Sequence, residues 1–289
     1  AGDYLANHIG TLPHSHILLA GMTGIGKSTV FFETVDGRRI VVFSTQLALE
    51  QASERFADAG LYYQHAKTAT AFDELIFTTY DSLQNVIKHV LDDETDDRAL
   101  CVDESHNFAL SSYRLSAMRK ALHAATSNKW RQVVFASGTP LTIEHPKLQP
   151  YQRVHVRSFV RNQPARMIRY KDENGTGDKI ATAVKMSACV EDGTKRSLFH
   201  LDDKNKQQRK LVAKLVAAGL DSAEIMTLTT DDKDSDEARA FLQSAEIPDH
   251  IRALVVTSVF IESVNLISIF DDAHLLSTPH PALAQQFVN

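Results

Sequence analysis

Residues Gly21–Ser28, GMTGIGKS, match the pattern GxxxxGK[ST] at every fixed position. This pattern is typical of a loop that binds the phosphates of a nucleotide. Its glycines let the backbone curl so that several amide N–H groups point at one phosphate, at the positive end of the following helix. The Lys27 ammonium would bind the outer phosphates, and the Ser28 hydroxyl would be a ligand of Mg²⁺. The residues expected to bind the nucleotide are therefore Gly21, Thr23, Gly24, Gly26, Lys27, Ser28 and Thr29.

The surrounding sequence favours nucleotide binding over a glycine-rich turn that happens to contain a lysine. The apolar stretch His16–Ala20 precedes the loop and has the composition of a strand, and a helix-compatible stretch follows it. Strand, loop and helix in this order form the usual context of the motif. We therefore expect a nucleoside triphosphate as the ligand, and the loop leaves open what its energy drives.

Two carboxylates and a histidine follow a second apolar stretch, Ala99–Val102. Asp103 is expected to hold Mg²⁺ across from Ser28, and Glu104 to orient and deprotonate the attacking water. His106 would sense the γ-phosphate or couple the site to a second domain. An ordinary acidic turn is the alternative, but the carboxyl end of a strand is where open α/β sheets bind ligands. The expected catalytic residues are Lys27, Asp103, Glu104 and His106, with Ser28 and Asp103 as the metal ligands.

A third polar segment, SGTP at 137–140, follows the apolar stretch Val133–Ala136. Alone it is merely a turn. Because it follows a strand and lies downstream of the other two motifs, its hydroxyl groups could hydrogen-bond the carboxylates and transmit the nucleotide state. Ser137 and Thr139 are therefore candidate coupling residues.

The elements that must position these side chains follow a βαβ pattern. Short apolar, β-branched stretches alternate with longer amphipathic ones, which is typical of a parallel sheet flanked by helices. The acidic segment Asp92–Arg98 is expected to be a solvated turn. We predict strands at His16–Ala20, Ile40–Ser44, Leu75–Thr79, Ala99–Val102 and Val133–Ala136, and helices at Thr45–Ala59, Tyr80–Leu91 and Ser111–Ala125.

Prolines cluster at Pro140–Pro150, so we predict one α/β domain at 1–150 and a second at 151–289. The arginine-rich stretch Arg153–Lys171 would line a phosphate track or form a solvated strand pair, two alternatives of equal weight. The loop Asp172–Gly177 follows it. Further on we predict strands at Ser197–Leu201, Glu224–Leu228 and Ala253–Thr257, and a helix at Asn205–Ala218.

The composition is that of a soluble globular chain, with 43% hydrophobic and 23% charged residues among 289. No apolar run approaches the ~20 residues that a membrane-spanning helix needs. Cys101 and Cys189 form neither a CxxC motif nor a disulfide framework, so a cytoplasmic or other reducing intracellular compartment is expected. The net charge of −5 argues against a uniformly basic surface, but a local groove and backbone amides can still bind nucleic acid. Oligomeric state is not indicated.

Together these segments resemble superfamily-2 helicases of the DExH type over nearly the whole chain. GMTGIGKST is similar to motif I, DESH at 103–106 to motif II, and SGTP to motif III. Val41–Gln46 and Thr78–Asp81 lie where motifs Ia and Ib belong, while Ser197–Asn205 resembles motif IV and Thr257–Leu266 motif V. The resemblance implies two RecA-like domains with ATP and Mg²⁺ in the cleft between them, and in-line attack of water on the γ-phosphate.

The same resemblance implies a single-stranded nucleic-acid partner. Motifs Ia, Ib and V contact the sugar-phosphate backbone in that family, which makes Thr45, Thr79 and Thr257 the candidate contacts, while Asn265 would approach the nucleotide. The implied activity is ATP-driven helicase or translocase movement along a strand, with DNA and a role in replication favoured over RNA. The alternatives are an ATPase that remodels protein and a nucleotide-gated clamp without turnover, although the intact Glu104 argues against the clamp.

The sequence departs from the family pattern in three places. No glutamine precedes the phosphate loop, so the adenine-reading Q motif is absent and the NTP specificity stays open. Ser263 replaces the usual glycine of motif V. Gln286 lies where motif VI begins, and the sequence ends at Asn289, before the arginines that reach the γ-phosphate in that family. We interpret the sequence as a piece of a longer protein that hydrolyses ATP slowly on its own.

Other conspicuous residues have ordinary structural explanations. The pair His14 and His16 has no cysteine or carboxylate cluster nearby, so a strand edge is favoured over a metal site. Trp130 is expected to pack in the core rather than stack on a base. Cys101 lies within an apolar strand and is expected to be inert.

Overall fold

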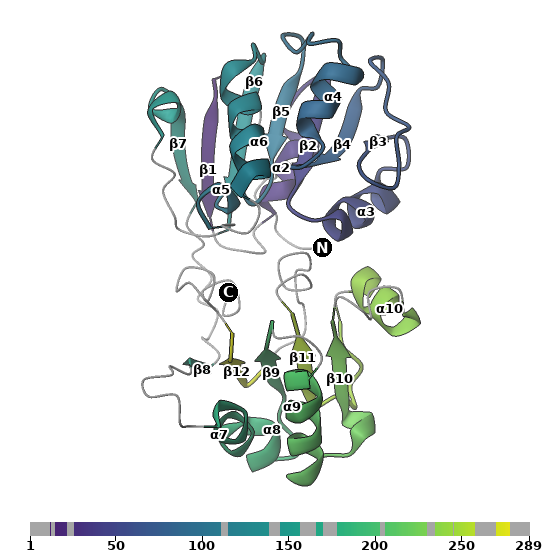
Figure 1. Cartoon of the computed structure of the whole chain (residues 1–289), viewed down its shortest axis with the longest axis vertical. Coiled ribbons are helices and arrows are strands. Elements are labelled where there is room, and N and C mark those ends of the chain that lie inside the picture. Colours follow the sequence, from purple (N-terminus) through teal and green to yellow (C-terminus); the bar gives the residue numbers. More distant parts are fainter. Residues whose placement is uncertain are drawn as a thin grey trace. The chain divides into compact units, whose positions relative to one another are not determined.

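The structure, a computed structural model, describes residues 12, 15–21, 26–110, 115–138, 145–156, 166–169, 178–202, 206–229, 235–244, 246–257 and 270–277. The chain divides into two compact units, Ala1–Arg161 and Asn162–Asn289, and each is built around its own parallel sheet (Figure 1). This confirms the predicted α/β class with two sheets flanked by helices. The division falls later than the predicted boundary at 150, because the strand after the proline cluster completes the first sheet.

The first unit contains a seven-stranded sheet in the order β3-β4-β2-β5-β6-β1-β7, in which every pair is parallel. Parallel pairing brings the carboxyl ends of all seven strands to one edge, where the predicted motifs lie. The strands are β1 (Ile17–Gly21), β2 (Arg39–Phe43), β3 (Gly60–Tyr62), β4 (Leu75–Thr79), β5 (Ala99–Val102), β6 (Gln132–Ser137) and β7 (Gln152–Val156).

Helices cover both faces of this sheet, and the alternating residues of β2 show which helix lies on which face. Val41 and Phe43 pack in a core with residues of α2 and α3, while Ile40 and Val42 pack in a second core with residues of α4 and α6. A sheet buried on both faces needs continuous apolar strands, which is why these strands were recognisable. The helices are α2 (Lys27–Glu33), α3 (Gln46–Arg55), α4 (Leu83–His89), α5 (Asn107–Leu110) and α6 (Leu115–Ser127), with a 3₁₀ helix η2 at Pro146–Leu148.

Most predicted elements of the first unit are present with small shifts at their ends. The predicted strands at 75–79 and 99–102 have the observed bounds. Helix α3 begins after Thr45, whose Oγ1 accepts a hydrogen bond from the N–H of Ala48 (3.1 Å) as an N-cap. Helix α4 begins later than predicted because the N–H of Ser82 closes a turn onto the carbonyl of Thr79 (3.0 Å). The acidic segment 92–98 forms turns, as predicted.

The second unit contains a five-stranded parallel sheet in the order β10-β11-β9-β12-β8. Apolar residues of α7 and α9 pack against β9 and β11 in its core. The strands are β8 (Arg166–Arg169), β9 (Ser197–His200), β10 (Ile225–Leu228), β11 (Ala253–Val256) and β12 (Asp272–Leu275); the helices are α7 (Lys179–Met186), α8 (Ala188–Glu191), α9 (Lys206–Ala217) and α10 (Asp236–Ser244), with η3 at Ser222–Glu224.

The arginine-rich stretch does not form the strand pair that was one of its two interpretations. Strand β7 pairs with β1 in the first sheet, and β8 pairs with β12 in the second, so the two strands belong to different units. Arg153 is exposed on β7, while residues 157–165 lie outside the described part of the chain. The phosphate-track interpretation stays a prediction.

Among the described residues, no helix combines the length and the apolar character that crossing a membrane requires.

Candidate active site

The edge formed by the carboxyl ends of β1, β5 and β6 brings together three motifs that are far apart in the sequence. The sheet order places β6 between β5 and β1 (Figure 1). Gly21 therefore ends one strand, Ser137 ends its neighbour, and Asp103 follows the third. Thr139 lies outside the described residues, as do Thr23 and Gly24 of the loop.

The start of α2 faces the carboxylates that follow β5. Gly26 lies immediately before the helix with φ 83°, in the left-handed region that glycine adopts at little cost, and Lys27 is the first helical residue. The Lys27 side chain is only 5% exposed. The Ser28 hydroxyl donates a hydrogen bond to Oδ2 of Asp103 over 3.2 Å. Thr29 lies on the same helix and is partly buried.

Backbone hydrogen bonds to β2 and β6 hold the turn at 103–106, here called the carboxylate turn. The N–H of Asp103 donates to the carbonyl of Val42 on β2 (3.0 Å), and the N–H of Ser105 donates to the carbonyl of Ala136 on β6 (2.8 Å). Between them, Glu104 has φ 48°, a left-handed conformation that costs a residue with a side chain about 1–2 kcal/mol. Such strain, maintained by surrounding bonds, is common at functional sites.

The Glu104 carboxylate contacts His106, and His106 in turn contacts the predicted coupling residue Ser137. Nδ1 of His106 lies 3.0 Å from Oε2 of Glu104 and 3.1 Å from Oγ of Ser137. The N–H of Gly138 donates to the same carboxylate oxygen over 3.4 Å. His106 is completely buried, with 0% of its side chain exposed. This placement favours coupling of Glu104 to the end of β6 over direct contact of His106 with a phosphate.

The two neighbouring carboxyl groups have pKa values shifted in opposite directions. Burial, with the charge of Glu104 beside it, raises the pKa of Asp103 to about 6. Burial also raises the pKa of Glu104, but the hydrogen bond from His106 and the charge of Lys27 outweigh it, so this pKa lies below its usual value. Burial lowers the pKa of Lys27, against the opposing effect of both carboxylates. Glu104 is therefore ionised at neutral pH.

The residues at this edge fit a Mg²⁺ ion. Magnesium prefers a few oxygen ligands from the protein and completes its shell with water and phosphate oxygens. The Ser28 hydroxyl and the Asp103 carboxylate provide two such oxygens, already 3.2 Å apart. Burial and the neighbouring charge of Glu104 raise the pKa of Asp103. A bound cation would stabilise the ionised form of this carboxyl group. No group of three or more histidine, cysteine, aspartate or glutamate side chains in the described residues indicates a different kind of metal centre.

We expect Asp103→Asn to stabilise the nucleotide-free protein at neutral pH, even though it removes a metal ligand. The folded-state pKa of Asp103, about 6, lies above the ordinary value of 3.8, so the unfolded chain ionises first as pH rises. The contribution of this group to the free energy of unfolding is thus fully present below about pH 4, and it is lost as the pH rises through about 6. Melting temperatures measured in EDTA should favour the variant by several degrees at pH 7.5 and converge with the unchanged protein near pH 4. An advantage that is the same at both pH values would contradict this assignment.

The predicted nucleic-acid contacts occupy strand ends, but their hydroxyl groups are engaged or buried. Thr45 follows β2 and caps α3, while Thr79 ends β4 and its Oγ1 donates to Oγ of Ser82 over 3.3 Å. Strands β2 and β4 are neighbours, so these two threonines lie at the same sheet edge. Thr257 follows β11 in the second unit and is buried. Asn265 and Gln286 lie outside the described residues.

Sequence reasoning missed the residue that holds the carbonyl of Asp103. The Tyr80 hydroxyl donates a hydrogen bond to this oxygen over 2.5 Å. The sequence placed Tyr80 at the start of a helix, and no spacing rule links the end of one strand to a turn that follows another. Only the order of the strands in the sheet, with β2 between β4 and β5, brings Tyr80 close to Asp103.

Two ordinary interpretations of conspicuous residues agree with the structure, and that of the pair His14 and His16 stays a prediction because only His16 is described. Trp130 is buried in the core and its indole N–H donates to the carbonyl of Ala124 (3.1 Å). Burial raises the pKa of the Cys101 thiol to about 12, which makes it a poor nucleophile. Nδ1 of His16 accepts a hydrogen bond from the N–H of Val133 (2.9 Å) beside the sheet, and His14 lies outside the described residues.

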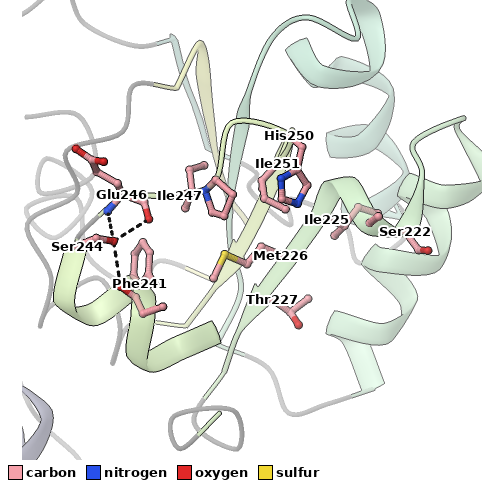
Figure 2. A pocket seen from close by; sticks show the side chains of 13 residues that line it. Ser222, Ile225, Met226, Thr227, Phe241, Ser244, Glu246, Ile247, His250 and Ile251 are labelled. Atoms are coloured by element: carbon pink, nitrogen blue, oxygen red, sulfur yellow. Dashed lines mark hydrogen bonds between the residues drawn. The ribbon is translucent and has the colours of Figure 1, made fainter. Parts of the chain in front are cut away.

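A cavity of about 600 Å³ lies in the second unit, beside β10 and α10 (Figure 2). Its wall is largely apolar and includes Ile225, Met226, Phe241, Ile247 and Ile251. None of the predicted site residues lines it.

Comparisons with known proteins give one family match, which lies in the first unit. Residues 5–140 match the family model described as the res subunit of type III restriction enzymes. No match to a curated protein was found.

Solved structures resemble nearly the whole chain at low sequence identity. The DEAH/RHA helicase HrpB of Escherichia coli has a TM-score of 0.63 and 15% identity, with 93% of this chain and 41% of HrpB covered. The Saccharomyces cerevisiae protein Dbp5, bound to RNA and ADP BeF3, has a TM-score of 0.59 and 14% identity over 94% of this chain and 81% of Dbp5. The Mycobacterium smegmatis helicase Lhr, bound to ssDNA and AMP-PNP, has a TM-score of 0.58 and 14% identity, with 94% of this chain and 41% of Lhr covered. The chain thus spans less than half of HrpB and Lhr, and the fold is shared.

Proposed function

We propose that this chain is a P-loop NTPase of the superfamily-2 helicase type, which hydrolyses ATP in a reaction stimulated by a single strand of nucleic acid. The family match over residues 5–140 and the shared fold support this proposal. The observation that carries this proposal is the pairing of the two nucleotide motifs. Ser28, next to Lys27 at the start of α2, donates a hydrogen bond to Asp103, and Glu104 follows at once on the same turn. This is the arrangement that phosphate binding and water activation require.

Each residue of this edge has a proposed role. The Lys27 ammonium binds the outer phosphates, where its charge balances theirs. Ser28 and Asp103 hold Mg²⁺, which when bound neutralises charge on the phosphates and the leaving group. Glu104 orients the attacking water and accepts its proton. His106 donates to Glu104 and, with Ser137, fixes the direction of this carboxylate.

The nucleic-acid part of the proposal rests on the edge that β2 and β4 share. Thr45 follows β2 and Thr79 ends its neighbour β4, so the segments that contain them lie side by side at the sheet edge. Since both hydroxyl groups have partners inside the protein, backbone amides of these segments are the proposed donors to the sugar-phosphate backbone. One protein of similar fold is bound to RNA and another to single-stranded DNA, so single strands of RNA and of DNA are both candidate substrates. The movement along the strand that a helicase or translocase performs is part of this proposal.

Binding to a backbone predicts strong dependence on salt and weak dependence on sequence. For a single strand, the logarithm of the affinity should fall linearly with the logarithm of salt concentration, with a slope of about −0.7 for each phosphate contacted. Fluorescence anisotropy with labelled strands of equal length and different sequence measures both properties. A strong sequence preference that salt barely changes would instead indicate recognition of bases, which the proposed contacts cannot provide.

A further inference from the structure

Tyr80 lies directly after β4, two strands away from β5 in the sheet, yet it contacts the backbone of Asp103. Its side chain is 1% exposed, and its hydroxyl donates a hydrogen bond to the carbonyl of Asp103 over 2.5 Å. None of the roles assigned above to Lys27, Ser28, Asp103, Glu104 or His106 uses this bond.

The bonded carbonyl belongs to the peptide unit that joins Asp103 to Glu104. The other end of that unit, the N–H of Glu104, donates to Oδ1 of Asp103 over 3.0 Å. Rotation of this peptide would change the direction of both carboxylates at once. Because Glu104 has a left-handed φ of 48°, relaxation to a more common conformation is favourable unless other bonds oppose it. The Tyr80 hydroxyl is placed to oppose it.

Packing fixes the position of this hydroxyl. The Tyr80 ring meets Phe108 edge-on, with centroids 5.2 Å apart, and Phe108 meets Phe135 in the same way at 5.7 Å. Phe108 lies on α5, just after the carboxylate turn, and Phe135 lies on β6, two residues before Ser137. The aromatic row of Tyr80, Phe108 and Phe135 therefore packs beside the turn and supports it. Edge-on pairs of this kind restrict ring orientation.

We propose that Tyr80 is a positioning residue for ATP hydrolysis, which acts by holding the Asp103–Glu104 peptide so that Glu104 points at the attacking water. This inference rests on the proposed hydrolysis, because it assigns Tyr80 a part in the same site. Tyr80 touches neither nucleotide nor water in this role. Its contribution passes through the backbone of the carboxylate turn.

The test uses Tyr80→Phe, which keeps the ring and its packing and removes the hydroxyl alone. The expected result is a fall in kcat of about tenfold, the rate equivalent of one hydrogen bond, with the KM for ATP changed by less than about twofold. Tyr63→Phe is the matched control. It removes a buried-ring hydroxyl from the same unit, one that donates to Oε1 of Glu50 over 3.2 Å, and it should leave kcat unchanged.

The same substitution in a Glu104→Gln background separates positioning from a general loss of structure. If Tyr80 acts through Glu104, Tyr80→Phe should lower turnover no further once Glu104 is replaced. An equal fall in both backgrounds, or a kcat equal to that of the unchanged protein, overturns the role of Tyr80 and leaves the proposed function standing. Absence of turnover in the unchanged protein overturns both proposals. Binding of a non-hydrolysable ATP analogue confirms that each variant is folded.

Discussion

Replacement of Glu104 with glutamine is expected to lower ATP turnover by about 10²–10⁴-fold while ATP and Mg²⁺ still bind, which is the usual scale for loss of a general base. The amide keeps the size of the side chain and can still accept the hydrogen bonds from His106 and Gly138, but it cannot take a proton from water. The effect should therefore fall on kcat. Single-turnover hydrolysis, with separate titration of a fluorescent ATP analogue, distinguishes the two steps.

The matched control is Glu54→Gln, which makes the same chemical change at an exposed position of α3. It should hydrolyse ATP at the rate of the unchanged protein. Near-normal hydrolysis by Glu104→Gln would show that another residue activates the water. A parallel loss of nucleotide binding would show that the substitution had disturbed the phosphate loop.

Replacement of Lys27 with alanine should weaken binding of Mg²⁺-ATP by at least ~30-fold, the effect of removing one partner of a buried charge pair. The Lys27 side chain is 5% exposed, so its ammonium group meets a bound phosphate with little screening by water. Its charge also opposes the rise in the pKa of Asp103 and contributes to the lowered pKa of Glu104. Its removal therefore leaves two buried carboxylates with less compensation, and they would repel the nucleotide.

Lys88→Ala tests whether loss of any lysine from this unit has the same effect, because Lys88 lies exposed on α4. Isothermal titration with ATP and Mg²⁺ should give this control the affinity of the unchanged protein. Wild-type affinity in Lys27→Ala would overturn the assignment of residues 21–28 as the phosphate loop. Lys27→Ala and Glu104→Gln are thus expected to separate ATP binding from ATP turnover.

The central strands of the first sheet were predictable because both of their faces are buried. Such strands consist of apolar residues throughout, as at 75–79 and 99–102, and the chain signals them without reference to distant parts. The motif residues were predictable for a related reason, since each motif lies at the end of one of these strands. Local sequence therefore located Lys27 and Asp103, but not the contacts between them.

Strands β7 and β12 escaped prediction because their residues are not uniformly apolar. Strand β7, QRVHV, is largely exposed, and so its sequence resembles a loop and the domain boundary was placed before it. Strand β12, DAHL, is fully buried, but two of its four residues are polar: Oδ2 of Asp272 lies 3.1 Å from Nε2 of His274. Burial of such a polar pair depends on the fold around it, and hydropathy alone cannot indicate that.

The geometry of the carboxylate turn depends on contacts that only the folded sheet creates. Glu104 adopts a left-handed φ, although nothing in its residue type favours one. The hydrogen bond from Tyr80 joins residues 23 positions apart in the chain, and the contact between His106 and Ser137 joins residues 31 positions apart. The identity of the candidate catalytic side chains was thus local information, while their orientation was not.

Hydrolysis of ATP with and without nucleic acid tests the proposed function most directly. The unchanged protein would be mixed with Mg²⁺-ATP under single-turnover conditions, alone and with saturating single-stranded DNA, single-stranded RNA or duplex, at low salt. At least one single strand should accelerate hydrolysis severalfold over the rate without nucleic acid, and Glu104→Gln should abolish that acceleration. A measurable rate that none of the three nucleic acids changes would contradict a nucleic-acid-stimulated ATPase.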